Sequence, residues 1–243
     1  MKNIVLAAGY ATRLYPVTEN FPKPLLETGG KTILDRLLSD IDVIDEIDSH
    51  LIVSNHRYIS HFERWADESR YTKNITLIDD GSVDNESRLG AVRDLLLAIE
   101  VGRLDDDLLV IASDNIVDFS FRGFVDYFKE KQTSLIMTCH EPELSALRRT
   151  GVITMDQHNK VQEMQEKPDN PLSHFAVPPF YLYKKSDLMF IQPCLDEGCH
   201  HDAPGNLVKA MLNKTIFHAW LMPGKRHDIG TLETYYQLIN LKF

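Results

Sequence analysis

The sequence predicts an α/β fold in which a mostly parallel, mixed sheet is flanked by helices. Three observations support this prediction. Short apolar runs alternate with longer amphipathic runs through the first half of the chain. The run at 108–112 is apolar at every position, which is typical of a strand buried on both faces. The second half then changes to closely spaced strand-like runs, which predicts a smaller β-rich portion.

The elements follow in the order that βα units require. In the first half, strands are expected at 3–7, 51–54, 75–78 and 108–113, and helices at 33–41, 56–69, 90–101 and 121–131. In the second half, the strands are expected at 151–155, 160–164, 180–183 and 215–221, the first two joined by a turn at 156–159. Helices are expected at 186–191, 206–212 and 232–240.

The composition excludes several classes of partner. The 243 residues include 36 acidic and 26 basic side chains, a net charge of −10, so no nucleic-acid surface is expected. No apolar run is long enough to span a bilayer, and Met1 leads directly into a core strand without a signal peptide. Three cysteines without a framework are typical of a reducing cytoplasm. We therefore expect a cytoplasmic protein with no membrane partner.

The most informative stretch is 5–27, where the first strand runs into a turn at Gly9. Arg13 follows four residues later, and Lys23 stands between two prolines that restrict its backbone. A turn at the carboxyl end of a strand is where open α/β sheets bind ligands, and its free N–H groups suit phosphates. Arg13 and Lys23 would add positive charge at this turn.

This stretch resembles the signature of the sugar-phosphate nucleotidylyltransferases, L-A-A-G-x-G-T-R-L-x-P-x-T-x-x-x-P-K-P-L. Ala11 stands where the family often has a second glycine, and alanine resists the φ > 0 conformations that glycine allows. Three later segments fit the same family: 108–115, which ends in Asp114-Asn115, the Glu166-Lys167-Pro168 element, and 227–231. Arg226, directly before the last segment, takes the position of an aromatic residue.

The resemblance covers the chain from residue 1 to about 236 and implies a single Rossmann-like nucleotidyltransferase domain. Residues 1 to about 135 would form the nucleotide-binding half, and about 136–243 the sugar-phosphate-binding half. The implied reaction is Mg²⁺-dependent transfer of a nucleotidyl group from a nucleoside triphosphate to a sugar 1-phosphate, with release of pyrophosphate, in the synthesis of surface polysaccharide or a related glycan. Glucose-1-phosphate thymidylyl-, uridylyl- and cytidylyltransferases are examples of the family.

The resemblance also implies roles for single residues. Arg13, Lys23 and Asp114 are the expected catalytic residues, and Asp114 and Asp228 the expected ligands of Mg²⁺. The nucleotide would contact Leu6, Ala7, Ala8, Gly9, Thr12, Arg13, Asp80, Leu89 and Gly90. The sugar phosphate would contact Lys23, Asn115, Gly151, Glu166 and Lys167.

Several of these residues also have a simpler interpretation. Asp228 could cap the last helix, although Thr231 could do that instead, and Asp114 could belong to an Asx turn. Gly151 could be an ordinary glycine at a strand start. The cluster Cys194, Cys199, His200 and His201 lacks a usual zinc spacing and is better interpreted as a polar loop, part of the sugar-pocket wall or a subunit contact.

Alternative functions remain at this point. One is a cytidylyltransferase acting on a non-sugar phosphate such as phosphocholine, and another is a non-catalytic regulatory subunit that binds nucleotides or sugar phosphates. A dinucleotide-binding oxidoreductase is disfavoured because no G-x-G-x-x-G follows the first strand. Asp79-Asp80-Gly81 lacks the glutamine of thymidylyl enzymes, so the base stays open, as do the sugar, the pathway and a homo-oligomeric state.

Overall fold

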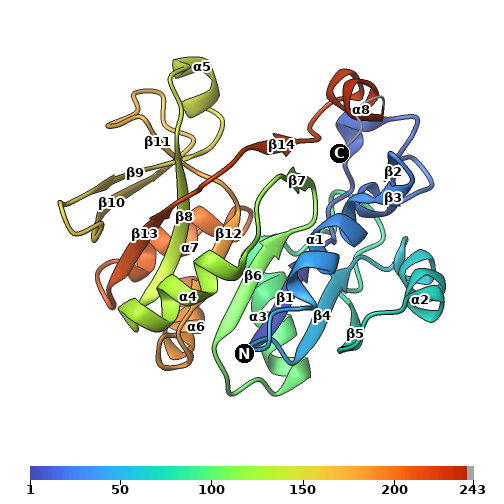
Figure 1. Cartoon of the computed structure of the whole chain (residues 1–243), viewed down its shortest axis with the longest axis horizontal. Coiled ribbons are helices and arrows are strands. Elements are labelled where there is room, and N and C mark those ends of the chain that lie inside the picture. The colour runs from blue at the N-terminus through green and yellow to red at the C-terminus, as the bar shows by residue number, and fades with distance from the viewer. Residues whose placement is uncertain (240–243) are drawn as a thin grey trace. The chain divides into compact units, whose positions relative to one another are not determined.

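The structure, a computed structural model, describes residues 1–239. The chain folds into two compact units, each built from segments that are distant in the sequence. Unit 1 contains 1–88, 112–122 and the described residues from 223 onward, and unit 2 contains 89–111 and 123–222. The colours in Figure 1 follow the residue number along the chain, so each of these segments can be found by its colour. The predicted division into a nucleotide half and a sugar-phosphate half concerns ligands and stays a prediction.

A parallel sheet forms the centre of unit 1 (Figure 1). It contains β1 (Lys2–Leu6), β4 (Ser49–Ser54) and β5 (Asn74–Asp79), in that order. Leu6 is in register with Val53, and Ser54 with Asp79, so the three strands end at the same edge. The residues that follow the strands therefore gather there, which is where ligands bind in such sheets.

The rest of unit 1 consists of helices and short hairpin-like pairs. The helices are α1 (Ile33–Ile41), α2 (Ile59–Glu68) and α8 (Leu232–Ile239), with short 3₁₀ turns η1 (Thr12–Leu14) and η2 (Lys23–Leu25). β2 (Glu27–Thr28) pairs with β3 (Lys31–Thr32), and β7 (Asn115–Val117) pairs with β14 (Arg226–Asp228). The last pair brings the middle and the end of the chain together.

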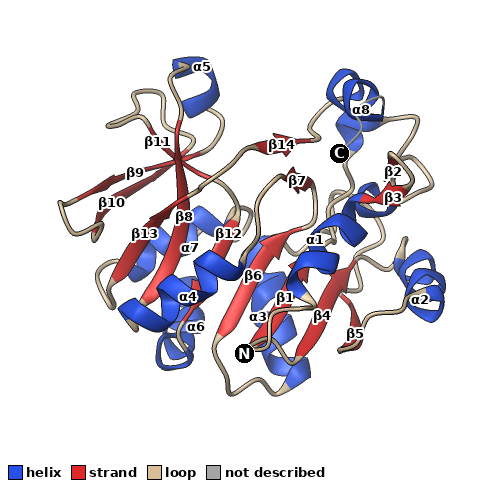
Figure 2. Ribbon diagram, viewed as in Figure 1, coloured by secondary structure: helices blue, strands red, loops and turns tan. Residues whose placement is uncertain are grey.

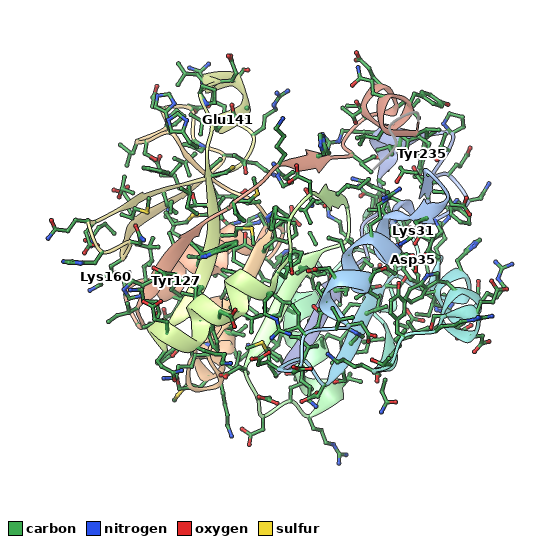
Figure 3. The ribbon with its side chains drawn as sticks, in the orientation of Figure 1. Lys31, Asp35, Tyr127, Glu141, Lys160 and Tyr235 are labelled. Carbon is green, nitrogen blue, oxygen red and sulfur yellow. The ribbon has the colours of Figure 1, made fainter. Side chains whose placement is uncertain are left out.

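Asp35, labelled in Figure 3, ties three parts of unit 1 together. Its carboxylate accepts hydrogen bonds from Trp65 Nε1 at 3.0 Å and from the Tyr71 hydroxyl at 2.7 Å. Its backbone N–H donates to the hydroxyl of Thr32, the N-cap of α1, at 2.9 Å. One residue thus joins the start of α1 to α2 and to the loop that follows it.

The sheet of unit 2 is mixed (Figure 2). The antiparallel neighbours, in order, are β6 (Leu108–Ala112), β12 (Phe180–Tyr183), β8 (Ser134–His140), β11 (Phe175–Val177), β9 (Gly151–Met155) and β10 (Val161–Glu166). β13 (Phe217–Leu221) pairs with β8 in parallel. The expected β-rich portion corresponds to these antiparallel strands.

Helices pack on this sheet. They are α3 (Ala91–Gly102), α4 (Arg122–Lys131), α5 (Leu144–Leu147), α6 (Ile191–Asp196) and α7 (Pro204–Met211), with the 3₁₀ segment η3 (Lys185–Phe190) before α6. Phe124 of α4 packs on Trp220 of β13, with ring centroids 5.5 Å apart. α7 packs on β10 and touches both α3 and α6, so it joins distant parts of unit 2.

The expected α/β class is confirmed, with local corrections. The helix expected at 56–69 begins only at Ile59, because Asn55 Oδ1 accepts the Tyr58 N–H in a turn before it. Of the helix expected at 186–191, residues 186–190 are 3₁₀, and Ile191 begins α6. Asn240, at the predicted end of the last helix, lies outside the described residues. In the part of the chain that the structure describes, no helix has the length and apolar character needed to cross a bilayer.

Candidate active site

The turn after β1 is held by β4 and the residue that follows it. The Ala7 N–H donates to the Val53 carbonyl at 2.8 Å, and Asn55 Nδ2 donates to the Ala8 carbonyl at 2.9 Å. Gly9 is exposed, and a Cβ placed there would meet no atom within 4 Å. Hydrogen bonds to Val53 and Asn55 therefore fix the backbone of this turn, while the space next to Gly9 is open to a ligand. A phosphate-binding turn requires both features.

Ala11 adopts the left-handed conformation that its side chain disfavours. Its φ is 47° and its ψ is 41°. Its carbonyl accepts hydrogen bonds from the Leu14 N–H at 2.9 Å and from Thr18 Oγ1 at 2.8 Å. These bonds hold the turn, and Ala11 adopts a φ above zero although its side chain disfavours it. The backbone follows a path that glycine would follow without strain.

Arg13 presents its guanidinium to solvent. It lies in η1 after Thr12, which is also exposed. The next residue, Leu14, is 1% exposed and belongs to an apolar cluster with Leu26 and Ile229. Within residues 1–239, Arg13 makes no hydrogen bond or ion pair. The buried leucine fixes the backbone while the charged side chain stays available for an anionic ligand.

Lys23, in contrast, is buried and already paired. Only 7% of the residue is exposed, and its Nζ donates to Asp114 Oδ2 at 3.0 Å. The lysine begins η2 after Pro22, whose extended backbone sets the direction of the turn. A buried ammonium needs a partner, and here that partner is one of the expected metal ligands.

Asp114 is oriented by its neighbours. The hydroxyl of Ser113 donates to the Leu6 carbonyl at 2.8 Å, which keeps Asp114 close to the end of β1. Fully buried Asn115 donates from Nδ2 to Asp114 Oδ1 at 2.6 Å and accepts from Arg226 at 2.7 Å. Arg226, which replaces an aromatic residue of the family pattern, therefore supports Asp114 through Asn115.

Asp228 faces the same group of charges. It lies opposite Asn115 in the β14–β7 pair, and the Ile229 N–H donates to the Asp114 carbonyl at 3.2 Å. The pKa of Asp228 is raised, first by desolvation and then by the negative charge of Asp114. Lys23, Arg226 and Arg13 act in the opposite direction. Asp228 is exposed to solvent, which screens these charges and weakens their effect on its pKa.

Capping does not explain Asp228. Thr231 Oγ1 accepts the Thr234 N–H at 3.2 Å and so caps α8 itself. Two neighbouring carboxylates that repel each other fit Mg²⁺, which takes one or two carboxylates and completes its coordination with phosphate and water. No cluster of three or more His, Cys, Asp or Glu side chains suited to a metal occurs among the described residues.

Asp80 follows β5 at the same edge. Its backbone N–H donates to the Ser54 carbonyl at 2.9 Å, and its Oδ1 accepts the Ser82 N–H at 2.7 Å. Ser82 Oγ lies 3.1 Å from the hydroxyl of Tyr10, next to the glycine turn. Burial raises the pKa of Asp80. The structure thus links Asp80 to the turn at Gly9 through one serine and one tyrosine.

In unit 2, Leu89 and Gly90 precede α3. Gly90 is the N-cap residue of this helix and has a φ of +90°, a conformation that residues with side chains rarely adopt. The Val92 N–H donates to the carbonyl of His201 at 2.9 Å. The backbone before α3 is therefore held by a distant segment of the same unit.

Glu166 lies in a cradle of two glycines. A Cβ on Gly151 would come within 2.5 Å of Met164 Cε and 3.5 Å of Glu166 Oε2, and a Cβ on Gly205 would overlap Glu166 Oε2. Burial raises the pKa of Glu166, and the charge of Lys167 opposes that shift. Close packing at Gly151 accounts for a glycine there even without a sugar.

The backbone changes direction at Lys167, directly after β10. Its φ is 47°, and its backbone N–H donates to the Thr150 carbonyl at 3.1 Å. Its side chain is exposed and has no hydrogen-bond or ion-pair partner among residues 1–239. Lys167 can therefore offer its ammonium to an anion, as Arg13 does in unit 1.

Comparison with known proteins decides the family. The model of a family described as nucleotidyl transferase matches residues 2–242. The chain belongs to the nucleotidyl transferase family. A glucose-1-phosphate adenylyltransferase of Fervidobacterium nodosum is 29% identical over 98% of this chain and 60% of its own length. A Sulfolobus acidocaldarius protein provisionally named mannose-1-phosphate guanyltransferase is 33% identical over 99% of this chain and 64% of its own.

These curated relatives are longer than the chain, which spans 60% to 64% of their length. Solved structures confirm the nucleotidyltransferase fold. A UDP-glucose pyrophosphorylase in complex with UDP-glucose has a TM-score of 0.83 at 19% identity, over 98% of this chain and 97% of its own. The same enzyme from Acinetobacter baumanii has a TM-score of 0.81 at 16% identity, over 98% of this chain and 91% of its own.

Within this nucleotidyl transferase, the structure brings several of the expected residues together. In unit 1 these are the glycine turn, Lys23, Asp114, Asn115 and Asp228. In unit 2 Gly151 and Glu166 are neighbours. The roles assigned to all of these residues remain predictions.

Four supporting residues were missed by sequence reasoning: Asn55, Ser82, Arg226 and His201. Asn55 carried a usable signal, because it directly follows a strand parallel to the first, as Asp80 follows the next. Arg226 stands out in the sequence only as a departure from the family pattern. Nothing in the local sequence indicates that His201 contacts Gly90.

Proposed function

We propose that the chain transfers a nucleotidyl group from a nucleoside triphosphate to a sugar 1-phosphate. The observation that carries this proposal is the group formed by Lys23, Asp114 and Asp228 beside the turn after β1. An ion pair with a second carboxylate next to it suits a divalent cation and phosphates, and it has no evident purpose in stability alone. Family membership supports the same reaction class.

The reaction needs no nucleophile from the protein. A phosphate oxygen of the sugar 1-phosphate forms a bond to the α-phosphorus, and the bond from that phosphorus to the bridging oxygen of the β-phosphate breaks. Pyrophosphate leaves with the electron pair of the broken bond. Both substrates are polyanions, so the protein must position them and offset their repulsion.

Unit 1 supplies the charges for the triphosphate. The backbone at Gly9 offers N–H groups, and the free guanidinium of Arg13 can contact the departing pyrophosphate with two donors. Lys23 is rigidly held, so its ammonium has a fixed place near the reacting phosphates. Asp80 and, in unit 2, Leu89 and Gly90 would contact the base.

Asp114 and Asp228 would hold Mg²⁺. The cation would supply positive charge to the α-phosphate and offset the repulsion that raises the pKa of Asp228. In the ligand-free chain, the ammonium of Lys23 forms an ion pair with Asp114 and offsets part of its charge. Asn115 and Arg226 keep Asp114 in orientation for this role.

Unit 2 supplies contacts for the sugar phosphate. The free ammonium of Lys167 would bind its phosphate, and the carboxylate of Glu166 would accept hydrogen bonds from sugar hydroxyls. The relatives include proteins named as adenylyl- and guanyltransferases, so they do not agree on one base. We leave base and sugar to experiment.

The test is release of pyrophosphate from ATP, GTP, dTTP, UTP or CTP with glucose, mannose or N-acetylglucosamine 1-phosphate and MgCl₂. We expect one pairing to dominate. Arg13→Ala should then lower kcat/KM by about 100-fold, as loss of a contact to transition-state charge does. Lys31→Ala removes an exposed lysine of unit 1 and should change nothing. Equal rates for Arg13→Ala and Lys31→Ala would refute the role of Arg13, and no release with any pairing would refute the proposed function.

A further inference from the structure

The polar segment before α7 packs directly against the turn before α3, and both lie in unit 2. A Cβ on Gly90 would come within 2.6 Å of His201 Nδ1 and 2.7 Å of the His201 carbonyl oxygen. A Cβ does not approach non-bonded heavy atoms this closely, so a residue with a side chain at position 90 would clash with His201. The two segments are more than a hundred positions apart in the sequence.

The backbone of the same residue makes a second connection. The carbonyl of His201 accepts the Val92 N–H at 2.9 Å, within the first turn of α3. A free N–H at a helix start needs a partner, and His201 provides one in place of a capping side chain, which Gly90 lacks. Ring and carbonyl together therefore fix Gly90 at its φ of +90°.

The ring of His201 has no hydrogen bond that would explain its placement. Its Nδ1 is buried without a hydrogen-bond partner, and the nearest carboxylate oxygen, Asp202 Oδ1, is 3.8 Å away. The ring of His200 stacks on it, with centroids 5.3 Å apart. A buried polar atom without a partner costs stability, so packing against Gly90 is the contact that accounts for the position of the ring.

The other end of the segment is anchored separately. Four residues later, Gly205 in α7 packs against Glu166, and α7 as a whole packs on β10. The segment 201–205 therefore connects the turn at Gly90 to the cradle of Glu166. Because α7 is held by its own packing, loss of the His201 ring should loosen Gly90 without moving Glu166.

We propose that His201 is a positioning residue for the base of the nucleoside triphosphate, acting through the backbone of Gly90. The inference rests on the proposed function, in which Gly90 contacts the base. His201 needs no contact with the nucleotide itself. Its ring and carbonyl keep the Gly90 backbone in the single conformation in which that backbone would contact the base.

The test compares two probes that share the triphosphate and differ in the nucleoside. Calorimetric titrations with MgCl₂ would give Kd values for inorganic tripolyphosphate and for whichever of ATP, GTP, dTTP, UTP and CTP binds most tightly. We expect His201→Ala to weaken the nucleotide about tenfold and tripolyphosphate less than twofold, because only the base contact is lost. The KM for the sugar 1-phosphate should stay within about twofold.

Two variants separate packing from other roles of His201. His201→Phe keeps a flat ring and removes the unpartnered Nδ1, so it should restore nucleotide affinity to within about threefold and raise the melting midpoint. His158→Ala removes an exposed histidine elsewhere in unit 2 and should leave both Kd values unchanged. If His201→Ala does not fold, His201→Asn, which also removes the ring but keeps a polar side chain, applies the same test.

The outcomes distinguish this inference from the proposed function. If wild type binds tripolyphosphate but no nucleotide more tightly, the proposed function fails and the inference fails with it. If wild type binds a nucleotide and His201→Ala binds it equally well, only the inference is overturned. An equal loss for nucleotide and tripolyphosphate would also overturn it, because such a loss indicates a general structural defect.

Discussion

At the scale of single residues, Ala11 illustrates how a turn can impose a conformation that its residue disfavours. Hydrogen bonds from Leu14 and Thr18 to its carbonyl hold φ at 47°. The left-handed conformation costs alanine about 1–2 kcal/mol, while glycine adds about 0.4–1 kcal/mol of chain entropy to the unfolded state. The native strain therefore exceeds the benefit of a side chain at this position.

Ala11→Gly should accordingly raise the free energy of unfolding by about 0.5–1 kcal/mol, measured by urea denaturation. Ala66→Gly, within α2, is the matched control and should lower it by about 1 kcal/mol, because glycine is a poor helix former. A loss of stability in both variants would mean that Ala11 is not strained.

Asp228 carries a pH dependence whose sign follows from its raised pKa. The folded state holds the proton of Asp228 more tightly than the unfolded state does. The resulting stability is complete below the ordinary Asp pKa and is lost as pH rises through the higher folded value. At pH 7 the ionised carboxylate therefore destabilises the ligand-free chain through desolvation and the charge of Asp114.

Asp228→Asn should raise the melting midpoint at pH 7 without Mg²⁺, and the gain should shrink toward pH 3. The same variant should lower turnover by at least about 100-fold and abolish the stabilisation by Mg²⁺ plus nucleotide. Asp45→Asn, an exposed carboxylate of unit 1, is the control. If Asp228→Asn had normal turnover at saturating Mg²⁺, Asp228 would not be a metal ligand.

Glu166 in unit 2 resembles Asp228 in unit 1: its ionised carboxylate lowers the stability of the folded chain, but the proposed function needs it. Burial between Gly151 and Gly205 raises its pKa, so its ionised form is unfavourable in the folded chain. Glu166→Gln should therefore unfold at higher urea concentration at pH 7 than wild type, with a smaller difference at pH 4. It should also raise the KM for the sugar 1-phosphate by about tenfold or more.

Glu163→Gln, an exposed position on the same strand, provides the comparison for Glu166→Gln. It should alter neither stability nor KM. Should Glu166→Gln be less stable than wild type at pH 7, the carboxylate must form a stabilising contact and our explanation of its raised pKa would be incorrect.

At the scale of elements, α1 and α2 depend on the carboxylate of Asp35, which accepts from Trp65 and Tyr71. Asp35→Ala leaves both donors without their acceptor and should lower the free energy of unfolding by about 2–3 kcal/mol. Asp67→Ala, at an exposed position of α2, should change it by less than about 0.5 kcal/mol. Similar values for the two variants would show that Asp35 does not join the helices.

The sequence predicted elements well where the local pattern determines them. Near-continuous apolar runs indicated β1, β4 and β6, and periodic runs indicated α1, α3 and α4. β8 was missed although it lies at the centre of the unit 2 sheet, and so were the three-residue strands β7, β11 and β14. Strands this short are stabilised by their partners and not by their own residues.

The candidate site likewise contains residues that the sequence indicates and contacts that it does not. Asp80 was expected from the family resemblance, and its place directly after a parallel strand agrees with the carboxyl edge of such a sheet as a ligand position. The ion pair of Lys23 with Asp114 joins positions 91 apart, and no local pattern encodes it. His201 was interpreted as part of a polar loop because its cluster lacks a usual zinc spacing, and its partner Gly90 has no side chain to suggest a contact.

At the scale of the whole molecule, the chain alternates between two compact units, and each unit contributes residues to which a role is proposed. Arg13, Lys23, Asp114 and Asp228 come from unit 1, whereas Gly90, Glu166 and Lys167 come from unit 2. The central claim is that these groups transfer a nucleotidyl group to a sugar phosphate and not to water.

The most direct test is ³¹P nuclear magnetic resonance of the wild-type chain with MgCl₂, the preferred nucleoside triphosphate and sugar 1-phosphate. Our account predicts signals of a nucleotide sugar and of pyrophosphate that grow in equal amounts, and their loss when the sugar 1-phosphate is omitted. Pyrophosphate accompanied by nucleoside monophosphate, or unchanged spectra with every substrate pair, would contradict the account.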